Sequence, residues 1–282
     1  MVCGIMDDKL PICAIVVTQN EERNISRCLA ALGDFSRVIV VDSHSTDRTC
    51  AIARDYGAQV VSFRWNGRYP KKRQWSLDTL ALTQDWVLWV DADEVVTPEL
   101  VVDLRRVFAK APEEAGFFVP GKYVWDGQVL YHGMRNNKLC LFDRRKMAFP
   151  VVDDLDVEGM GEIEGHYQPV LKAGHEGASI GQIRAPLIHY AYEDAQGWEA
   201  RHRRYACWEV DMTRKDAWPR DPVAWREQAK VFLRGFALRG WVMFLYSYVW
   251  KCGFLDGRAG FDFAMSRKRY CDMIRAVMRE GG

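Results

Sequence analysis

The stretch Trp86-Val-Leu-Trp-Val-Asp-Ala-Asp-Glu94 is the part of the sequence that says most about the fold. It opens with a short continuous apolar run, which is typical of a strand that is covered on both faces. Asp91 and Asp93 follow this run directly. We therefore predict a buried strand over residues 86–90 that ends in two neighbouring carboxylates.

Apolar runs and helical patterns alternate through residues 1–110. Three more runs, rich in Val and Ile, predict strands over residues 12–18, 38–42 and 60–63. Apolar residues at positions i, i+3, i+4 and i+7 predict one helix from Ile25 onward and another over residues 97–108. This alternation predicts an α/β fold with a mostly parallel sheet.

Residues that favour helix N-termini mark two of the helix starts. Thr97 and Pro98 are suited to the N-cap and to the first helical position of the helix that follows the Asp91-Ala-Asp93 turn. Ser45 or Thr46 is expected to cap the helix after the second strand in the same way.

The pattern changes after Pro112. Residues 123–130 predict a hairpin on the two-residue turn Asp126-Gly127, and short strands are expected over 139–142 and 187–190. We expect antiparallel additions to the same sheet, so that residues 1–192 form one domain with halves 1–110 and 111–192.

Residues 193–282 are expected to form a helical, basic extension. They hold six of the eleven tryptophans, and residues 194–282 carry 17 Lys and Arg against 11 Asp and Glu. Helical patterns cover 198–213 and 223–238. The longest apolar run, Trp241 to Trp250, is shorter than the roughly 20 residues that span a bilayer.

Composition excludes several classes of protein. The chain has 282 residues, of which 49% are apolar and 27% charged, so a disordered protein is excluded. Its eight cysteines include no CxxC pair, which argues against a zinc ribbon and a disulfide framework and favours reduced thiols. We expect no signal peptide and no membrane span. We also expect no nucleic-acid binding, because no recognised nucleic-acid-binding module and no basic stripe is present.

Polar residues follow three of the predicted strands, at the carboxyl edge where parallel sheets bind ligands. The Asp91-Ala-Asp93 pair brings two like charges together, which favours a hard divalent cation between them. Asp-rich turns also follow strands, and cap helices, in proteins where they bind nothing. No GxGxxG motif and no P-loop occur, so a nucleotide would be held by other means.

Three motifs resemble the signatures of family 2 glycosyltransferases of the GT-A fold. They are Val16-Val-Thr-Gln-Asn-Glu-Glu-Arg-Asn-Ile25, Val40-Val-Asp-Ser-His-Ser-Thr-Asp-Arg-Thr49 and Trp86-Val-Leu-Trp-Val-Asp-Ala-Asp-Glu94. The chain is more closely similar to the bacterial branch that adds β-linked sugars to lipopolysaccharide core. That branch also shows Pro186-Leu-Ile-His-Tyr190 and Gly253-Phe-Leu-Asp-Gly-Arg-Ala-Gly260.

The resemblance implies a metal-dependent, inverting glycosyltransferase with a nucleotide-sugar donor, which we expect to be a UDP-sugar. Its acceptor would be lipopolysaccharide core or another cell-surface polysaccharide. The nucleotide-sugar cleft would be lined by Thr18, Asn20, Glu21, Asp42, Lys72, Asp91, Ala92 and Asp93. Mn²⁺ or Mg²⁺ would be bound by Asp91, Asp93 and His189. Read without the family, Lys72 is a solvated helix start and His189 a structural residue.

An inverting transfer needs a general base for the acceptor hydroxyl. Related enzymes carry a Val-His-Glu-like element, and this chain has Gly161-Glu-Ile-Glu-Gly-His-Tyr-Gln-Pro169 in its place. Glu164 is our first candidate and Glu162 our second, and Asp153 and Asp154 stay open as alternatives. His166 would bind acceptor or pack.

The basic, Trp-rich extension suits a cytoplasmic enzyme on the inner face of the bacterial inner membrane, with a glycolipid acceptor. The Trp241 to Trp250 face would enter the interface, with cations near the lipid headgroups: Arg234, Arg239, Lys251 and Arg258. Alternatively, these aromatic residues form the core of the extension or an oligomer contact.

Two other functions compete with the transferase. A sugar nucleotidyltransferase usually has a basic, Gly-rich first loop, whereas Gln19-Asn-Glu-Glu22 would repel a triphosphate. A non-catalytic carbohydrate-binding protein would have no reason to keep repelling carboxylates at Asp91 and Asp93.

Overall fold

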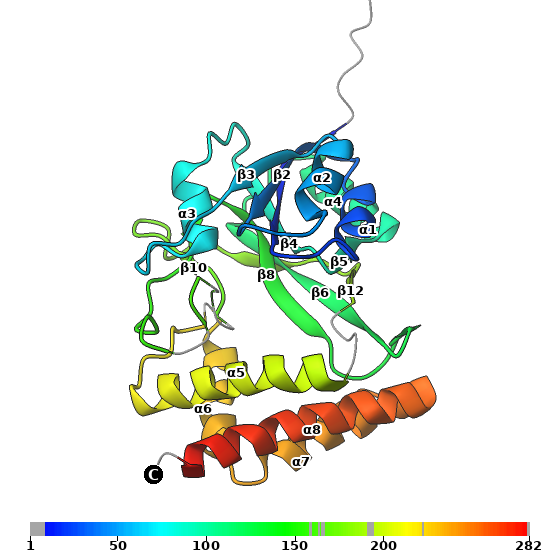
Figure 1. Ribbon diagram of the computed structural model, residues 1–282, viewed down its shortest axis with the longest axis vertical. Helices are drawn as coiled ribbons and strands as arrows, with labels where there is room; N and C mark the ends of the chain where they lie inside the picture. Colours follow the sequence, from blue (N-terminus) through cyan, green and yellow to red (C-terminus); the bar gives the residue numbers. More distant parts are fainter. Residues whose placement is uncertain are drawn as a thin grey trace, which may run out of the picture.

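A computed structural model describes residues 9–157, 160–162, 164, 167–190, 195–221 and 223–280. Its centre is a ten-stranded mixed sheet with the strand order β3-β2-β1-β4-β8-β6-β12-β5 (Figure 1). The other two strands, β7 and β11, pair with β6. The chain is therefore an α/β protein.

Four parallel strands form the N-terminal half of the sheet. They are β1 (Leu10–Thr18), β2 (Phe35–Asp42), β3 (Gln59–Ser62) and β4 (Trp86–Asp91). The middle of β1 and nearly all of β4 are buried, as continuous apolar runs predict. All four strands lie within three residues of the predicted boundaries.

Helices connect these strands. They are α1 (Ile25–Ala30), α2 (Thr49–Asp55), α3 (Lys72–Thr79) and α4 (Pro98–Phe108). Figure 1 shows α1, α2 and α4 grouped together, with α3 on the other side of the parallel strands. The Thr97 hydroxyl accepts a hydrogen bond from the Leu100 N–H at 3.1 Å, so the predicted cap of α4 is confirmed.

The predicted cap of α2 is wrong. This helix begins at Thr49, and Arg48 occupies its N-cap position without a side-chain cap. The Ser45 hydroxyl instead donates to the Asp42 carboxylate at 2.5 Å. The Ser45 hydroxyl, which the sequence pattern assigned to the helix cap, is therefore bound by Asp42 instead.

The predicted antiparallel additions are present. The strand β8 (Asn136–Asp143) pairs antiparallel with both β4 and β6 (Gly116–Trp125). Asp126 and Gly127 join β6 to β7 (Gln128–Val129) with φ values of 50° and 75°, and two positive φ values are what a type I′ turn requires.

Short strands complete this half. They are β5 (Glu94–Val96), β9 (Met147–Ala148), β10 (Val170–Leu171), β11 (Ile180–Gln182) and β12 (Leu187–His189). β12 runs parallel to β6 and antiparallel to β5. The turn after β4 therefore leads into β5, which lies at the end of the sheet and pairs with β12.

The C-terminal part is helical, as predicted. It comprises α5 (Ala195–Arg214), α6 (Ala224–Gly235), α7 (Arg239–Leu245), the π-helical turn η1 (Tyr246–Trp250), the 3₁₀ turn η2 (Gly253–Asp256) and α8 (Gly257–Glu280). α5 and α8 pack side by side next to the sheet, and α7 packs on α8 (Figure 1). The predicted boundary between residues 192 and 193 lies outside the described residues.

The extension has one buried cluster of its own and one shared with the sheet. Ala206 and Val210 of α5 pack against Tyr270 and Ile274 of α8. Trp208 of α5 instead belongs to the large core around the sheet. The described cysteines are free thiols, and within the described ranges no helix has both the length and the apolar character needed to cross a bilayer.

Candidate active site

The polar residues predicted from the sequence come together at the carboxyl edge of the parallel strands. Strand register places Thr18 of β1 beside Asp42 of β2 and Val17 beside Asp91 of β4. Asp42 and Thr18 are buried. Three strands therefore deliver their last side chains to one region.

The loops after β1 and β2 are tied into one rim. The Asn20 carboxamide oxygen accepts from the Thr46 N–H at 2.8 Å, and the Asn20 N–H donates to the Ser45 hydroxyl at 2.7 Å. Asn20 has a φ of 55°, a value that Asn adopts more readily than most residues. The Glu21 N–H donates to the Thr49 hydroxyl at 2.8 Å.

Asp42 and Thr18 form the floor behind this rim. The Asp42 carboxylate accepts from the Ser45 N–H at 2.9 Å and from the Ser45 hydroxyl at 2.5 Å, so its orientation is fixed. The Thr18 hydroxyl is buried and has no hydrogen-bond partner within the described part of the chain. A buried polar atom of this kind is usually satisfied by a bound group or water.

A hollow of about 270 Å³ opens beside Asp93. Residues from the β1–α1 loop, from the β2–α2 loop and from α5 line it: Asn20, Glu21, Glu22, Arg23, Asn24, Asp47, Asp93, Tyr190 and Arg201. Arg201 and Tyr190 were not among the site residues predicted from the sequence. Arg201 belongs to α5, so the C-terminal extension contributes to the site.

Asp93 faces His189. Since β12 pairs antiparallel with β5, His189 lies opposite Glu94, and its Nε2 comes within 3.2 Å of Asp93 Oδ2. Burial lowers the pKa of His189, but the charge and hydrogen bond of Asp93 and the charge of Glu94 together outweigh burial, so the pKa lies above its ordinary value. Burial likewise raises the pKa of Asp93, and His189 more than offsets it, so the pKa is lowered.

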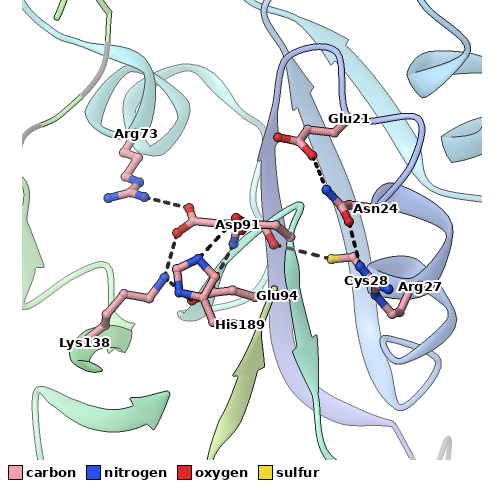
Figure 2. Close-up of polar contacts among 10 residues, drawn as sticks. Glu21, Asn24, Arg27, Cys28, Arg73, Asp91, Glu94, Lys138 and His189 are labelled. Carbon is pink, nitrogen blue, oxygen red and sulfur yellow. Dashed lines mark hydrogen bonds and ion pairs between the residues drawn. The ribbon is translucent and has the colours of Figure 1, made fainter. Parts of the chain in front are cut away.

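Asp91 faces two cations instead (Figure 2). Its Oδ1 lies 2.9 Å from Arg73 Nη2 and its Oδ2 lies 2.7 Å from Lys138 Nζ. Lys138 Nζ also lies 2.6 Å from Glu94 Oε1. Burial would raise the pKa of Asp91, but Lys138 and Arg73 hold it well below its ordinary range.

The pairing of Arg73 and Lys138 with Asp91 could not be predicted from the sequence. Arg73 stands next to Lys72, and only the fold distinguishes which of the two reaches Asp91. Lys138 is 47 residues from Asp91 in sequence and comes beside it through β4–β8 pairing. No sequence motif marked this position.

Asp93 and His189 fit a divalent cation. Adjacent ligands of an octahedral ion with bonds of about 2.1 Å are about 3.0 Å apart, close to the 3.2 Å between Nε2 and Oδ2. A carboxylate oxygen and an imidazole nitrogen suit Mn²⁺ or Mg²⁺. The described residues include no group of three or more His, Cys, Asp and Glu that would hold a metal. Ligation by Asp91 stays a prediction.

Glu164 and Glu162 lie at the N-terminus of α3. Glu164 Oε1 accepts from the backbone N–H of Arg73 at 2.6 Å. Burial raises the pKa of Glu164, although the positive charge of Arg73 offsets part of this effect. Glu162 Oε1 pairs with Lys72 Nζ at 2.7 Å and accepts from the Ser43 hydroxyl. His166 lies outside the described residues.

The two alternative bases have other surroundings. Asp154 is buried, and its carboxylate pairs with Lys71 at 2.9 Å and accepts from the Tyr69 hydroxyl at 2.6 Å and from Trp208 Nε1 at 3.1 Å. Asp153 is exposed. The full set of partners around Asp154 is that of a structural carboxylate.

Comparison with known proteins places this site in a family. Residues 13–156, just over half of the chain, match the model of glycosyl transferase family 2. An uncharacterized glycosyltransferase of Rickettsia conorii is 39% identical over 99 residues, which is 35% of this chain and 34% of that protein. The lipopolysaccharide core biosynthesis glycosyltransferase LpsC of Rhizobium meliloti is 31% identical over 119 residues, 40% of this chain and 43% of that protein.

A solved structure confirms the fold. The structure is similar to a mannosyltransferase from Pyrobaculum calidifontis, solved in complex with GDP-Man and Mn²⁺, with a TM-score of 0.53 and 14% identity over 96% of this chain and 87% of that chain. The likeness extends over the C-terminal helices and bears out the predicted GT-A architecture. The chain belongs to glycosyl transferase family 2.

Proposed function

We propose that this protein is an inverting glycosyltransferase that moves a hexose from a UDP-sugar to lipopolysaccharide core or another cell-surface polysaccharide. The observation that carries the proposal is the Asp93–His189 pair at the carboxyl edge of the sheet, beside the buried Asp42. The likeness to LpsC supports the choice of acceptor.

The donor nucleotide would bind across the ends of β1 and β2. The fixed Asp42 carboxylate would accept a hydrogen bond from the ring N–H of uracil or from the ribose. The unpartnered Thr18 hydroxyl and the rim residues Asn20 and Glu21 would supply further polar contacts.

Asp93 and His189 would hold Mn²⁺ or Mg²⁺, which neutralises the charge that builds up on a diphosphate leaving group. Arg73 and Lys138 add two positive charges in the same region, and Lys72 lies at the start of α3. Charge in a water-poor site acts more strongly than in solution, so these side chains would favour departure of the nucleotide diphosphate.

Glu164 would remove the proton of the attacking acceptor hydroxyl. A raised pKa suits this role, because a base works best when its pKa lies closer to the working pH. The acceptor oxygen would then attack the anomeric carbon from the face opposite the nucleotide, which inverts the configuration. Glu162 remains the second candidate.

The Asp93→Asn variant tests this proposal. We expect Mn²⁺ to raise the affinity of the wild-type protein for UDP, and the variant to lose this effect together with transfer, by about 100-fold or more. Isothermal titration with UDP, with and without Mn²⁺, measures the first effect. The matched control is Asp85→Asn, since Asp85 pairs with Arg145 at 2.9 Å at the opposite end of β4. A folded Asp93→Asn variant with normal turnover would contradict the proposal.

We further propose that the C-terminal extension rests on an anionic membrane that carries the acceptor. An apolar stripe, defined here as Trp241, Leu245, Val249 and Trp250, is exposed along α7 and η1, and Trp250 is 77% exposed. Such exposure argues that the stripe is not the core of the extension.

The positive charge around the stripe favours an anionic membrane, and not a second copy of the chain, as its partner. Lys251, which follows the stripe, and Arg258 of α8 are exposed, and residues 194–282 carry six more basic than acidic residues. Cations beside exposed Trp side chains favour an anionic interface. Arg239 contributes less, because it is paired with Glu209.

Flotation with vesicles tests the membrane proposal. The wild-type protein should float with anionic vesicles at moderate salt, and Leu245→Asp/Trp250→Ser should not. Tyr56→Ser, which removes an exposed aromatic residue on α2, should behave like wild type. A wild-type protein that stays at the bottom, or forms a dimer that the stripe variant abolishes, would contradict the proposal.

A further inference from the structure

Lys138 lies between two carboxylates and is largely withdrawn from solvent. Its Nζ is 2.7 Å from Asp91 Oδ2 and 2.6 Å from Glu94 Oε1, and only 20% of its side chain is exposed. Glu94 is 0% exposed, and its other oxygen accepts from the Asp91 N–H at 3.1 Å. The ammonium group therefore satisfies two negative charges at once.

The sheet register places Lys138 there. β8 runs antiparallel to β4 with Leu88 opposite Leu141. Asp91 follows Leu88 by three residues and Lys138 precedes Leu141 by three, so the antiparallel direction of the two strands brings them near each other. Their side chains then meet at 2.7 Å.

This arrangement disfavours Asp91 as a metal ligand. Arg73 lies beside one carboxylate oxygen and Lys138 beside the other, so a metal ion there would meet two positive charges. A cation that bound Asp91 would have to displace Lys138, which would leave the buried Glu94 without its counter-charge. Asp93 and His189, by contrast, face each other at 3.2 Å, and neither has a Lys or Arg ion pair among the described residues.

We propose that Lys138 is a positioning residue that reserves Asp91, so that the chain alone offers a divalent cation two ligands and binds it tightly only together with a diphosphate. The inference rests on the proposed function. A cation held by Asp93 and His189 would complete its shell with diphosphate oxygens and water. Glu94 acts through Lys138, because it fixes the ammonium group beside Asp91.

Binding of Mn²⁺ without nucleotide tests the inference directly. We expect the wild-type protein to bind Mn²⁺ weakly alone and at least about tenfold more tightly with UDP. The double variant Lys138→Met/Glu94→Gln removes one positive and one negative charge, so the net charge is kept and no carboxylate loses its only partner. It should bind Mn²⁺ alone at least about tenfold more tightly than wild type, because Asp91 would no longer be held by Lys138 and could serve as a third ligand. Electron paramagnetic resonance of free Mn²⁺ measures both affinities.

Two controls separate this role from a structural one. Lys138→Arg keeps a cation beside Asp91 and should bind Mn²⁺ like wild type. Lys146→Met removes a lysine whose Nζ contacts only the Glu113 and Glu114 carbonyls, and it should also leave binding unchanged. Damage to the fold would weaken Mn²⁺ binding, whereas the inference predicts stronger binding.

Two results would overturn the inference and one would overturn the proposed function. Lys138 has no such role if wild type binds Mn²⁺ equally well without UDP, or if the folded double variant binds Mn²⁺ alone no more tightly than wild type. A wild-type protein that binds neither UDP nor UDP with Mn²⁺ contradicts the proposed function itself.

Discussion

His189 makes the stability of the cation-free protein depend on pH. Its pKa lies above the ordinary value of 6.5 because Asp93 and Glu94 together outweigh the effect of burial. The protonated imidazole therefore stabilises the fold fully below pH 6.5, and this contribution is lost as pH rises through the raised pKa. We expect His189→Gln to be less stable than wild type at about pH 6 and nearly as stable at about pH 9.

Urea unfolding at the two pH values measures this difference. The control is His132→Gln, whose imidazole is exposed. A stability difference between His189→Gln and wild type that does not change with pH would contradict the prediction.

Cation binding should follow the opposite trend. A metal ligand must be a neutral imidazole, so Mn²⁺ and protons compete for His189. The affinity for Mn²⁺ in the presence of UDP should rise with pH until the raised pKa of His189 has been passed. Titration with Mn²⁺ at a series of pH values measures this, and an affinity that falls over the same range would exclude His189 as a ligand.

Glu164 and Glu162 can be separated by single substitutions. Glu164→Gln should keep Mn²⁺-dependent UDP binding and lose turnover by about 10²- to 10⁴-fold, the usual contribution of a general base. Glu162→Gln should have a smaller effect, because Glu162 is paired with Lys72. Turnover and UDP affinity of both variants show which residue is the general base. Loss of turnover in Glu162→Gln alone would assign the base to Glu162.

At the residue scale, the sequence predicted side chains that follow strand ends and missed those that arrive by tertiary pairing. Asp42 and Asp93 end or follow predicted strands, and they lie at one edge of the sheet. Lys138 and Arg201 carry no local signal: the first depends on the β4–β8 register and the second on how α5 packs.

At the element scale, prediction succeeded where one local force dominates. Continuous apolar runs located β1 to β4, and positive φ values at Asp126 and Gly127 were implied by the Asp-Gly turn. The start of α2 was wrong because Ser45 serves two interactions of the site, with Asp42 and with Asn20. Requirements of the ligand-binding loops thus override helix-capping preference.

Thr97 connects a helix cap to the strand that carries His189. Its hydroxyl accepts from the Leu100 N–H at 3.1 Å and donates to the Pro186 carbonyl at 2.8 Å. Thr97→Ala should lower the free energy of unfolding by about 1–2 kcal/mol, the usual cost of losing a cap. Thr97→Ser keeps the hydroxyl and should retain most of the stability. Chemical denaturation measures both, and equal losses in the two variants would show that the methyl group matters instead.

At the scale of the whole molecule, one buried carboxylate joins the catalytic half to the C-terminal extension. Asp154 contacts Lys71 and Tyr69 just before α3, and Trp208 of α5. α3 also presents Arg73 to Asp91. Asp154 is therefore one of the contacts through which the packing of the extension affects the placement of site residues.

Substitution of Asp154 should accordingly affect both parts of the protein. Asp154→Asn removes the carboxylate that pairs with the buried Lys71 at 2.9 Å, which should cost about 3–5 kcal/mol of unfolding free energy. The neighbouring Asp153→Asn removes an exposed charge and should change stability by less than about 0.5 kcal/mol. Urea unfolding followed by tryptophan fluorescence measures the stability, and UDP titration of the folded fraction reports on the site. Because α3 begins beside Asp154, we expect weaker UDP binding along with lower stability. An Asp154→Asn variant as stable as Asp153→Asn would mean that the Asp154 carboxylate is not needed to hold the extension in place.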